Sequence, residues 1–166
     1  MNAPHLTIAN APLGTLIAAG ILAGRFFLEE KPYAIIVAPK HEGEFPATAW
    51  NKSLKAVDGA LSDFDGLANT RAMAEAASPL AVKTLALRIG EVDDWYLPSR
   101  GELLLAWSAR EAMPEGEKFE KDIYWTSTQY AGDRSYAWYQ GFLNGTQNYW
   151  HKDDLLMARA VRRVAI

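Results

Sequence analysis

Hydrophobic residues recur with strand-like spacing near both ends of the chain. Residues 24–30 (GRFFLEE) and 33–40 (YAIIVAPK) are predicted to be two strands joined by a turn at Lys31-Pro32. The polar, turn-rich residues 41–50 are predicted to form a loop. Three further strand-like segments follow in the last third of the chain, at residues 123–130, 136–152 and 157–166.

The middle of the chain carries helix signals instead. Residues 71–77 (RAMAEAA) favour a helix, and Asp65 or Asn69 before them could cap its start. Pro79 is expected to open a second helix that ends before Gly90. A capping box at residues 99–102 (SRGE) predicts a third helix over residues 100–110, and the charged residues 113–122 are predicted to be an exposed loop. The order of strands, helices and strands indicates one α+β domain over residues 1–166.

The segment YAWYQGFLNGTQNYWHK carries five Tyr and Trp side chains around one Asn-Gly pair. Asn-Gly is a strong signal for a two-residue hairpin turn, because both central residues of that turn need positive φ. Such a turn would place Tyr139 opposite Trp150 on one face of a β-ribbon and Trp138 opposite His151 on the other. A register slip of one residue would exchange the two faces.

Two interpretations of these aromatic residues are open. Both faces could be buried in a small domain, which suits Trp138 and Phe142. Burial suits the polar residues of the segment less well, because such side chains favour water; they are Asn148, His151, Lys152, Asp153 and Asp154. Tyr and Trp beside Asn, Asp and His is also the composition of recognition surfaces. We therefore expect one face to be a binding surface.

Composition and charge narrow the possible functions. The chain has 166 residues, a formal net charge of -3 and no cysteine. The charge gives no reason to expect binding to nucleic acid or to an anionic membrane, and the lack of cysteine excludes disulfides, thiolate metal sites and cysteine nucleophiles. The apolar residues 11–24 are too short to span a bilayer, and no Lys or Arg precedes them. We expect a buried helix or strand there, with no signal peptide and no membrane insertion.

Motifs that could carry chemistry are incomplete. Residues 63–66 (DFDG) resemble part of a calcium loop, but its first and twelfth positions would be Leu61 and Ala72, which are not ligands. The three histidines, His5, His41 and His151, lack metal-ligand spacing, and Ser127 has no nucleophile motif around it. The three arginines at 159, 162 and 163 are expected to form salt bridges with acidic loops. We expect no enzymatic activity, metal or cofactor; a hydrolase built on an unrecognised carboxylate pair is the enzymatic alternative.

Four segments, in order, resemble the C-type-lectin-like domain of the Lcl C-terminal type found in bacterial and phage proteins. They are DWYLPSRGEL, YWTSTQY, AWYQGFLNG and ARAVRRV, within residues 93–164. That family typically shows W-x-L-P-[ST]-x-x-E-L, W-[ST]-S-T, A-W-x-x-x-F-x-x-G and a closing V-R. The resemblance implies a C-type-lectin-like fold, with two helices packed on a small twisted antiparallel sheet and long loops.

The disulfides and calcium motif of animal C-type lectins are missing here, so calcium-dependent sugar binding is not implied. The formylglycine-generating enzymes of the same fold need a cysteine for catalysis.

The chain is also similar to the variable proteins of diversity-generating retroelements. In those proteins a C-terminal segment displays mutable residues on a fixed lectin-like scaffold, often for phage attachment to a host. Residues 130–154 are rich in the residue types that the mutable codons commonly give, and they end just before ARAVRRV, where such segments usually close. Trp138 and Phe142 match the fixed frame and are expected to point inward. Tyr139 and Asn148 match no frame position and are expected to point outward.

These observations predict a non-enzymatic, phage- or prophage-encoded protein that binds a protein or glycan of the host surface. It would lie in the virion or tail, or in the bacterial cytoplasm before assembly. The alternative is a structural virion or tail-assembly protein whose aromatic face is a subunit interface, in a homo-oligomer or against other virion proteins. In the first case, aromatic side chains supply contact area and polar ones hydrogen bonds. The expected ligand-binding residues are Tyr130, Asp133, Tyr136, Tyr139, Asn144, Asn148, Tyr149, Trp150 and His151.

Overall fold

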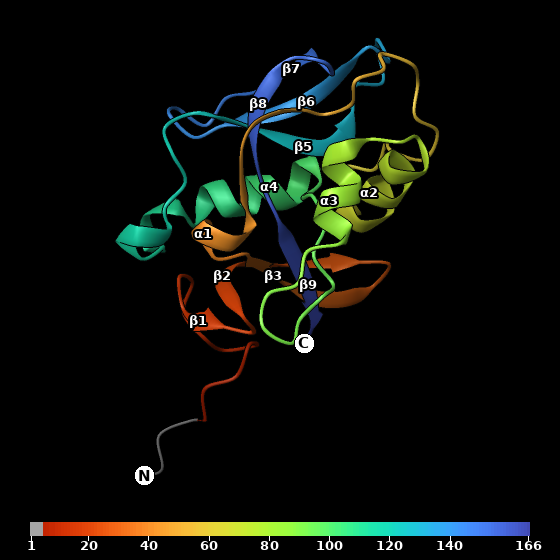
Figure 1. Cartoon of the computed structure of the whole chain (residues 1–166). Helices are drawn as coiled ribbons and strands as arrows, with labels where there is room; N and C mark the ends of the chain where they lie inside the picture. The colour runs from red at the N-terminus through yellow and green to blue at the C-terminus, as the bar shows by residue number, and fades with distance from the viewer. Residues whose placement is uncertain (1–4) are drawn as a thin grey trace.

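Two β-sheets lie on opposite sides of a central helix (Figure 1). The computed structural model describes residues 5–166, and all counts refer to this range. The first sheet has the order β1-β2-β3-β9 and the second β4-β8-β5-β6-β7. The strands are β1 (Leu16–Ile17), β2 (Gly20–Leu28), β3 (Lys31–Val37), β4 (Glu44–Ala49), β5 (Ile123–Gln129), β6 (Tyr136–Gly141), β7 (Gln147–His151), β8 (Leu155–Arg159) and β9 (Val161–Ala165). The helices are α1 (Lys40–Gly43), α2 (Gly66–Glu75), α3 (Pro79–Leu85) and α4 (Arg100–Ser108), with short 3-10 turns at Arg110–Ala112 and Glu115–Glu117.

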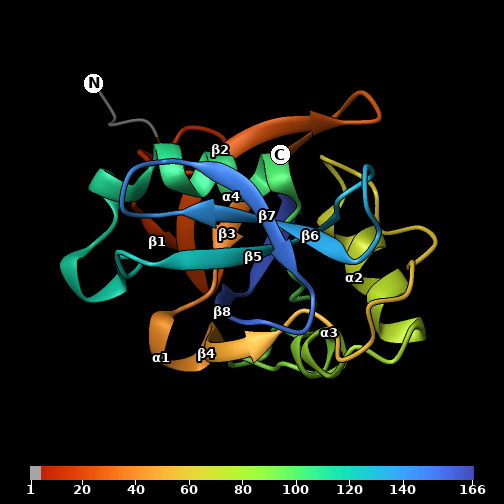
Figure 2. The same cartoon turned by 90° about the horizontal axis from the view of Figure 1, so that it is seen from above.

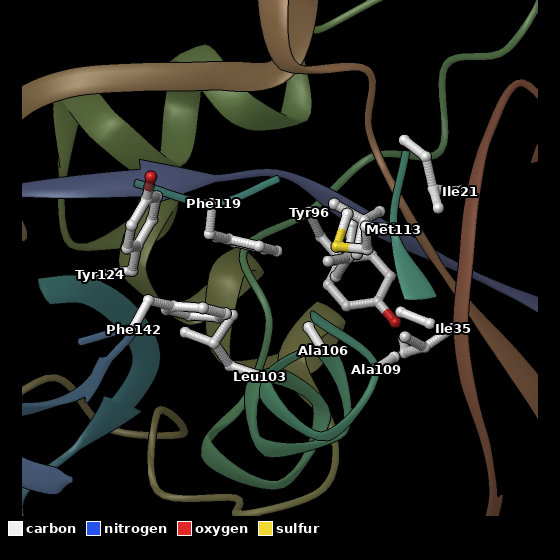
Figure 3. Packing of buried hydrophobic residues seen from close by; sticks show 13 residues of the cluster. Ile21, Ile35, Tyr96, Leu103, Ala106, Ala109, Met113, Phe119, Tyr124 and Phe142 are labelled. Atoms are coloured by element: carbon white, nitrogen blue, oxygen red, sulfur yellow. The ribbon is translucent and has the colours of Figure 1, made fainter. Parts of the chain in front are cut away.

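Helix α4 is the central helix, and it begins at the predicted capping box. The Glu102 N–H donates to Ser99 Oγ at 3.3 Å, and the Ser99 N–H donates to Glu102 Oε2 at 2.8 Å. Helix α4 contacts β2 and β3 on one side and β5 and β6 on the other, and in Figure 2 it lies behind β6. Its buried side chains join a core between the two sheets. In Figure 3, the rings of Phe119 and Phe142 lie face to face in this core, with centroids 4.0 Å apart.

Helices α2 and α3 pack against each other and begin where the sequence predicts. Asp65 caps α2 by accepting a hydrogen bond from the Ala68 N–H at 3.0 Å. Pro79 opens α3, which ends at Leu85 rather than continuing toward Gly90. Together with Trp50, these helices build a second core with buried residues of β4, β5, β6 and β8. No helix in the described part of the chain is both long and apolar enough to cross a membrane.

The mixed helix-and-sheet class is as predicted, but the expected two helices on one small sheet are not what the structure shows. Residues 5–166 form four α-helices and two sheets. Part of the difference comes from residues 41–50, which were predicted to be a loop and instead contain the end of α1 and the strand β4. Pro46 suggests a loop, yet it is tolerated because β4 is an edge strand with a bulge between Phe45 and Thr48.

The first two hairpins turn at positions that the sequence does not signal. Glu29 and Glu30 form the turn between β2 and β3, with φ of 48° and 64°, so the predicted turn at Lys31-Pro32 is wrong. Two successive residues of positive φ match the twist of paired strands. Ala18 and Ala19 turn the chain in the same way between β1 and β2, so residues 11–24 contribute strands rather than a helix.

Arg159 lies at the junction of the two sheets, where only Ala160 separates β8 from β9. Its buried guanidinium donates to the Ala38 carbonyl at 3.0 Å, and to the carbonyl and carboxylate of Glu117 at 2.6 and 2.9 Å. The neighbouring arginines form the expected pairs, Arg162 with Asp94 and Arg163 with Asp65. The segment 113–122 was predicted to be an exposed loop, but Met113 and Phe119 within it are buried. The bonds between Arg159 and Glu117 hold this segment against the junction of the sheets.

Candidate functional site

Strands β6 and β7 form the predicted aromatic hairpin, but the register differs by two residues. Tyr139 pairs with Asn148, and Trp138 pairs with Tyr149. The hairpin loop covers residues 142–145, and the Gly141 N–H donates to the Thr146 carbonyl at 2.7 Å. The turn is longer than two residues because Phe142 turns into the core, where it is only 6% exposed. A shift of two residues preserves the alternation, so the two faces contain the predicted residues.

One face of the hairpin carries a group of touching rings, which we call the aromatic ladder. Its members are Tyr130, Tyr136, Trp138, Tyr149 and His151. The rings of Tyr130 and Tyr149 are stacked, with centroids 3.9 Å apart and planes within 9°. Trp138 meets both of them edge-on, at 5.4 and 5.6 Å. The ring centroids of Tyr136 and His151 lie 4.1 Å apart, and this pair extends the ladder to the end of β7.

Arg100, the first residue of α4, fixes the ladder to the helix. Its guanidinium carbon lies 3.7 Å from the ring centre of Trp138, which is the geometry of a cation–π contact. Arg100 Nε donates to Gln147 Oε1 at 3.1 Å, and Gln147 Nε2 donates back to the Arg100 carbonyl at 3.0 Å. Asp63 approaches the same guanidinium at 3.8 Å. Because helix α4 is anchored between both sheets, these contacts give the ladder a rigid support.

Apart from the Arg100 guanidinium on Trp138, the charged group next to the ladder lies at its border. Asp133, in the loop between β5 and β6, accepts a hydrogen bond from the Ser135 N–H at 2.9 Å, and this bond keeps the pKa of the Asp133 carboxyl below its usual value. A hydrogen bond with the Tyr149 hydroxyl raises the pKa of Tyr130, so the Tyr130 phenol stays neutral at physiological pH. A ligand on the ladder would therefore meet aromatic rings, phenol hydroxyls and the Arg100 guanidinium.

The structure brings together some of the expected ligand-binding residues and separates others. Tyr130, Tyr136, Tyr149 and His151 share the ladder, with Asp133 near its end. The remaining four lie elsewhere: Asn144 in the hairpin loop, and Tyr139, Asn148 and Trp150 on the opposite face. The expectation that Tyr139 points outward needs correction, because Tyr139 is half-buried and packs against the core around Trp125. Phe142 points inward as predicted, whereas Trp138 is only half-buried, beneath Arg100.

Sequence reasoning missed Arg100 and Gln147 and misplaced Lys152. The first two lie 47 positions apart, and neither has a local signal that links it to the aromatic residues. Lys152 was expected to favour water, but it is fully buried. Its ammonium group donates to the Lys55 carbonyl at 2.9 Å and to Gln129 Oε1 at 2.6 Å, over the ring of Trp50. Burial lowers the pKa of Lys152 to about 8.

Open hollows border the hairpin. One of about 370 Å³ follows the outer edge of β7 and is lined by Tyr136, Asn148, Tyr149, Trp150 and His151. A second of about 410 Å³ lies at the loop end, with Ile123, Tyr139 and Thr146 in its lining. Among residues 5–166 there is no group of three or more His, Asp or Glu side chains that could hold a metal ion. The surface therefore offers contact area and hydrogen bonds.

Comparison with known proteins agrees with the motifs in the sequence. A search of curated proteins gave no match. The family model of the Lcl C-terminal domain matches residues 46–162, which include α2, α3, α4 and the whole aromatic hairpin. The match covers more than half of the chain. With the motifs, the hairpin and this match together, the chain belongs to the Lcl C-terminal domain family.

Proposed function

We propose that this domain is a non-enzymatic binding module that holds its ligand against the aromatic ladder. One observation carries the proposal: five touching rings lie on one face of a hairpin and are supported by a cation–π contact from a central helix. Rings held in place lose little conformational entropy on binding, and large aromatic side chains supply most of the contact energy in recognition surfaces. Asp133 and His151 would add hydrogen bonds at the border.

The finer proposal is a C-type-lectin-like receptor-binding protein of a phage or prophage, with residues 130–154 as a diversified segment. It is supported by the origin of the ladder: Tyr130, Tyr136, Tyr149 and His151 come from this segment, whereas Arg100 comes from outside it. Sequencing the gene across a population of its carrier tests this part. We expect amino-acid changes to cluster in residues 130–154 and to spare Trp138 and Phe142. An invariant segment would contradict diversification and leave a fixed recognition surface.

Binding to intact cells of the bacterium that carries the gene tests the ladder itself. The double variant Tyr130→Ala/Tyr149→Ala removes the stacked pair, and we expect the labelled protein to bind the cells at least about tenfold more weakly, as for the loss of an interface hot spot. Phe27→Ala is the matched control, because Phe27 is 72% exposed in the other sheet. Undiminished binding by the double variant, or an equal loss in the control, would contradict the assignment.

A subunit interface is the second candidate function, and a different observation favours it. Trp150 is 49% exposed on the face opposite the ladder, where it does not contact the other rings of the hairpin. An exposed Trp on an outer strand is typical of interface residues. The two functions need not exclude each other, because the ladder and Trp150 lie on different faces of the same ribbon.

A further inference from the structure

Each of the two sheets has two edge strands, and three of these four edges are protected against pairing with another chain. The strand β1 is only two residues long, and the part of β2 beyond it carries Arg25, which donates hydrogen bonds to the carbonyls of Ile8 and Ala11. The strand β9 carries two arginines and is covered at Val161 by backbone hydrogen bonds with Tyr96 at 2.8 and 2.9 Å. The strand β4 contains Pro46 and a bulge. Short length, charge, proline and bulges are the usual devices that prevent edge-to-edge association.

The fourth edge, β7, lacks these devices. Its residues, QNYWH, include no Pro, Lys or Arg. Two backbone hydrogen bonds mark the ends of the hairpin: the Lys152 N–H donates to the Ser135 carbonyl at 3.0 Å, and the Gly141 N–H donates to the Thr146 carbonyl at 2.7 Å. The even-numbered residues of β7 therefore point their backbone N–H groups toward β6. The alternation of antiparallel pairing then directs the N–H groups of residues 147, 149 and 151 away from β6.

Space and partners for a further strand are present along this edge. The hollow of about 370 Å³ follows it, with side chains from both faces of β7 in its lining. Of the outward N–H groups, that of Tyr149 donates to Asn148 Oδ1 at 2.9 Å. Asn148 is exposed, so its side chain can rotate away and release this N–H to an incoming carbonyl. An added strand would replace this local bond with a ladder of backbone bonds.

We propose that β7 pairs antiparallel with β7 of a second copy of this chain, around a twofold axis at Tyr149. The strand suits self-pairing, because His151 then stands opposite the partner's Gln147 and no two like charges face each other across the axis. Asn148 then lies opposite the partner's Trp150. The hollow lined by Ile123, Tyr139 and Thr146 lies next to Asn148 on the same face, and it has room for the ring of the partner's Trp150.

Charge complementarity supports a second copy rather than an unrelated strand. Asp153 and Asp154 follow directly after β7. Antiparallel pairing brings them beside the partner's hairpin loop. The hollow at that loop is lined by Lys121, which can pair with them, and by the neighbouring Asp122. This pairing does not depend on the proposed ligand function, because it is made by the edge of β7. It would place the ladders of both copies next to each other on the α4 side of a continuous sheet.

Sedimentation velocity of the full chain over about 1 to 200 µM tests the pairing, because an interface of one short strand falls in the small, weak class. We expect the mass to rise from 18.4 kDa toward twice that value with concentration. The variant Asn148→Lys/Trp150→Lys changes two exposed positions and should stay monomeric throughout. Ala47→Lys, at an exposed position of the protected β4 edge, is the matched control and should behave as wild type. Near-UV circular dichroism checks that all variants fold.

Hydrogen exchange at single amides locates the interface. The outward amides of Gln147 and His151 should exchange more slowly as concentration rises in the wild type, and at a constant rate in the lysine variant. An 18.4 kDa monomer over the whole range would overturn the proposal. So would a dimer that survives both lysines, or one that leaves these two amides unprotected. Tyr130→Ala separates the two proposals, because it should weaken cell binding and leave the mass unchanged.

Discussion

Glu102 is a buried carboxyl group shared by two helix starts and a tyrosine. Its Oε2 accepts hydrogen bonds from the Ser99 N–H at 2.8 Å and the Gly66 N–H at 3.1 Å, and its Oε1 accepts from the Tyr96 hydroxyl at 2.6 Å. Burial outweighs these bonds and raises the pKa of Glu102 to about 7. The sequence identifies Glu102 as part of a capping box, but its bond to the start of α2 depends on tertiary contact.

The raised pKa of Glu102 predicts how stability changes with pH. Between its ordinary value of 4.5 and about 7, the folded protein keeps a proton that the unfolded chain has released. This contribution therefore makes the free energy of unfolding fall as pH rises through that window, by roughly 3 kcal/mol, and stay level above it. Glu102→Gln keeps the shape without a charge: the amide oxygen can accept from the two backbone N–H groups, and the amide nitrogen can donate to the Tyr96 hydroxyl. The fall in stability should therefore disappear.

Urea unfolding at about pH 5 and about pH 8 measures the effect as a difference in unfolding free energy. Glu75→Gln is the control, because Glu75 is an exposed acid of α2 and should leave the pH difference of the wild type unchanged. If Glu102→Gln retains the full wild-type difference between the two pH values, Glu102 is not the group that carries a proton in the folded protein.

At the scale of elements, the β6–β7 hairpin shows how a local signal and a tertiary contact combine. Asn-Gly correctly predicts a reversal at this position, but only Gly145 has positive φ, at 82°. Asn144 instead accepts a hydrogen bond from the Thr146 N–H at 3.1 Å through its side chain. The loop lengthens because Phe142 enters the core, and Gly145 then lies directly against the ring of Trp107.

Gly145→Ala should destabilise the protein for two reasons that add. An alanine at φ +82° costs about 1–2 kcal/mol, and its Cβ would lie 2.7 Å from Trp107, closer than side chains tolerate. We expect a total loss of roughly 2–3 kcal/mol in the free energy of unfolding, measured by denaturant titration. Gly116→Ala is the control, because a Cβ there meets nothing within 4 Å and should change stability little. Equal losses in both variants would contradict the role of Gly145.

At the scale of the whole molecule, the ladder depends on segments that are distant in sequence. Arg100 at the start of α4 contacts Trp138 in β6, and Tyr130 after β5 stacks on Tyr149 in β7. The two sheets between which α4 lies are joined through Arg159, whose bonds tie the β8–β9 junction to the segment around Glu117.

The parts that could be predicted are those in which a few neighbouring residues decide the structure. Ser99, Asp65 and Pro79 mark helix starts because caps and proline act within one turn of chain. The hairpin at Gly145 was found for the same reason. The turns at Glu29-Glu30 and Ala18-Ala19 were missed, because these residue types carry no turn preference and the pairing of the strands imposes the left-handed conformation.

By itself, the sequence determined the helix starts, the place of the aromatic hairpin and the division of its residues between two faces. It did so because capping, turn chemistry and strand alternation are properties of adjacent residues. The tertiary structure alone decided the loop length, the burial of Lys152 and Tyr139, and which face becomes a supported surface. Those outcomes depend on Phe142 filling the core and on Arg100 meeting Trp138. Such contacts between distant residues form only when the sheets close around α4.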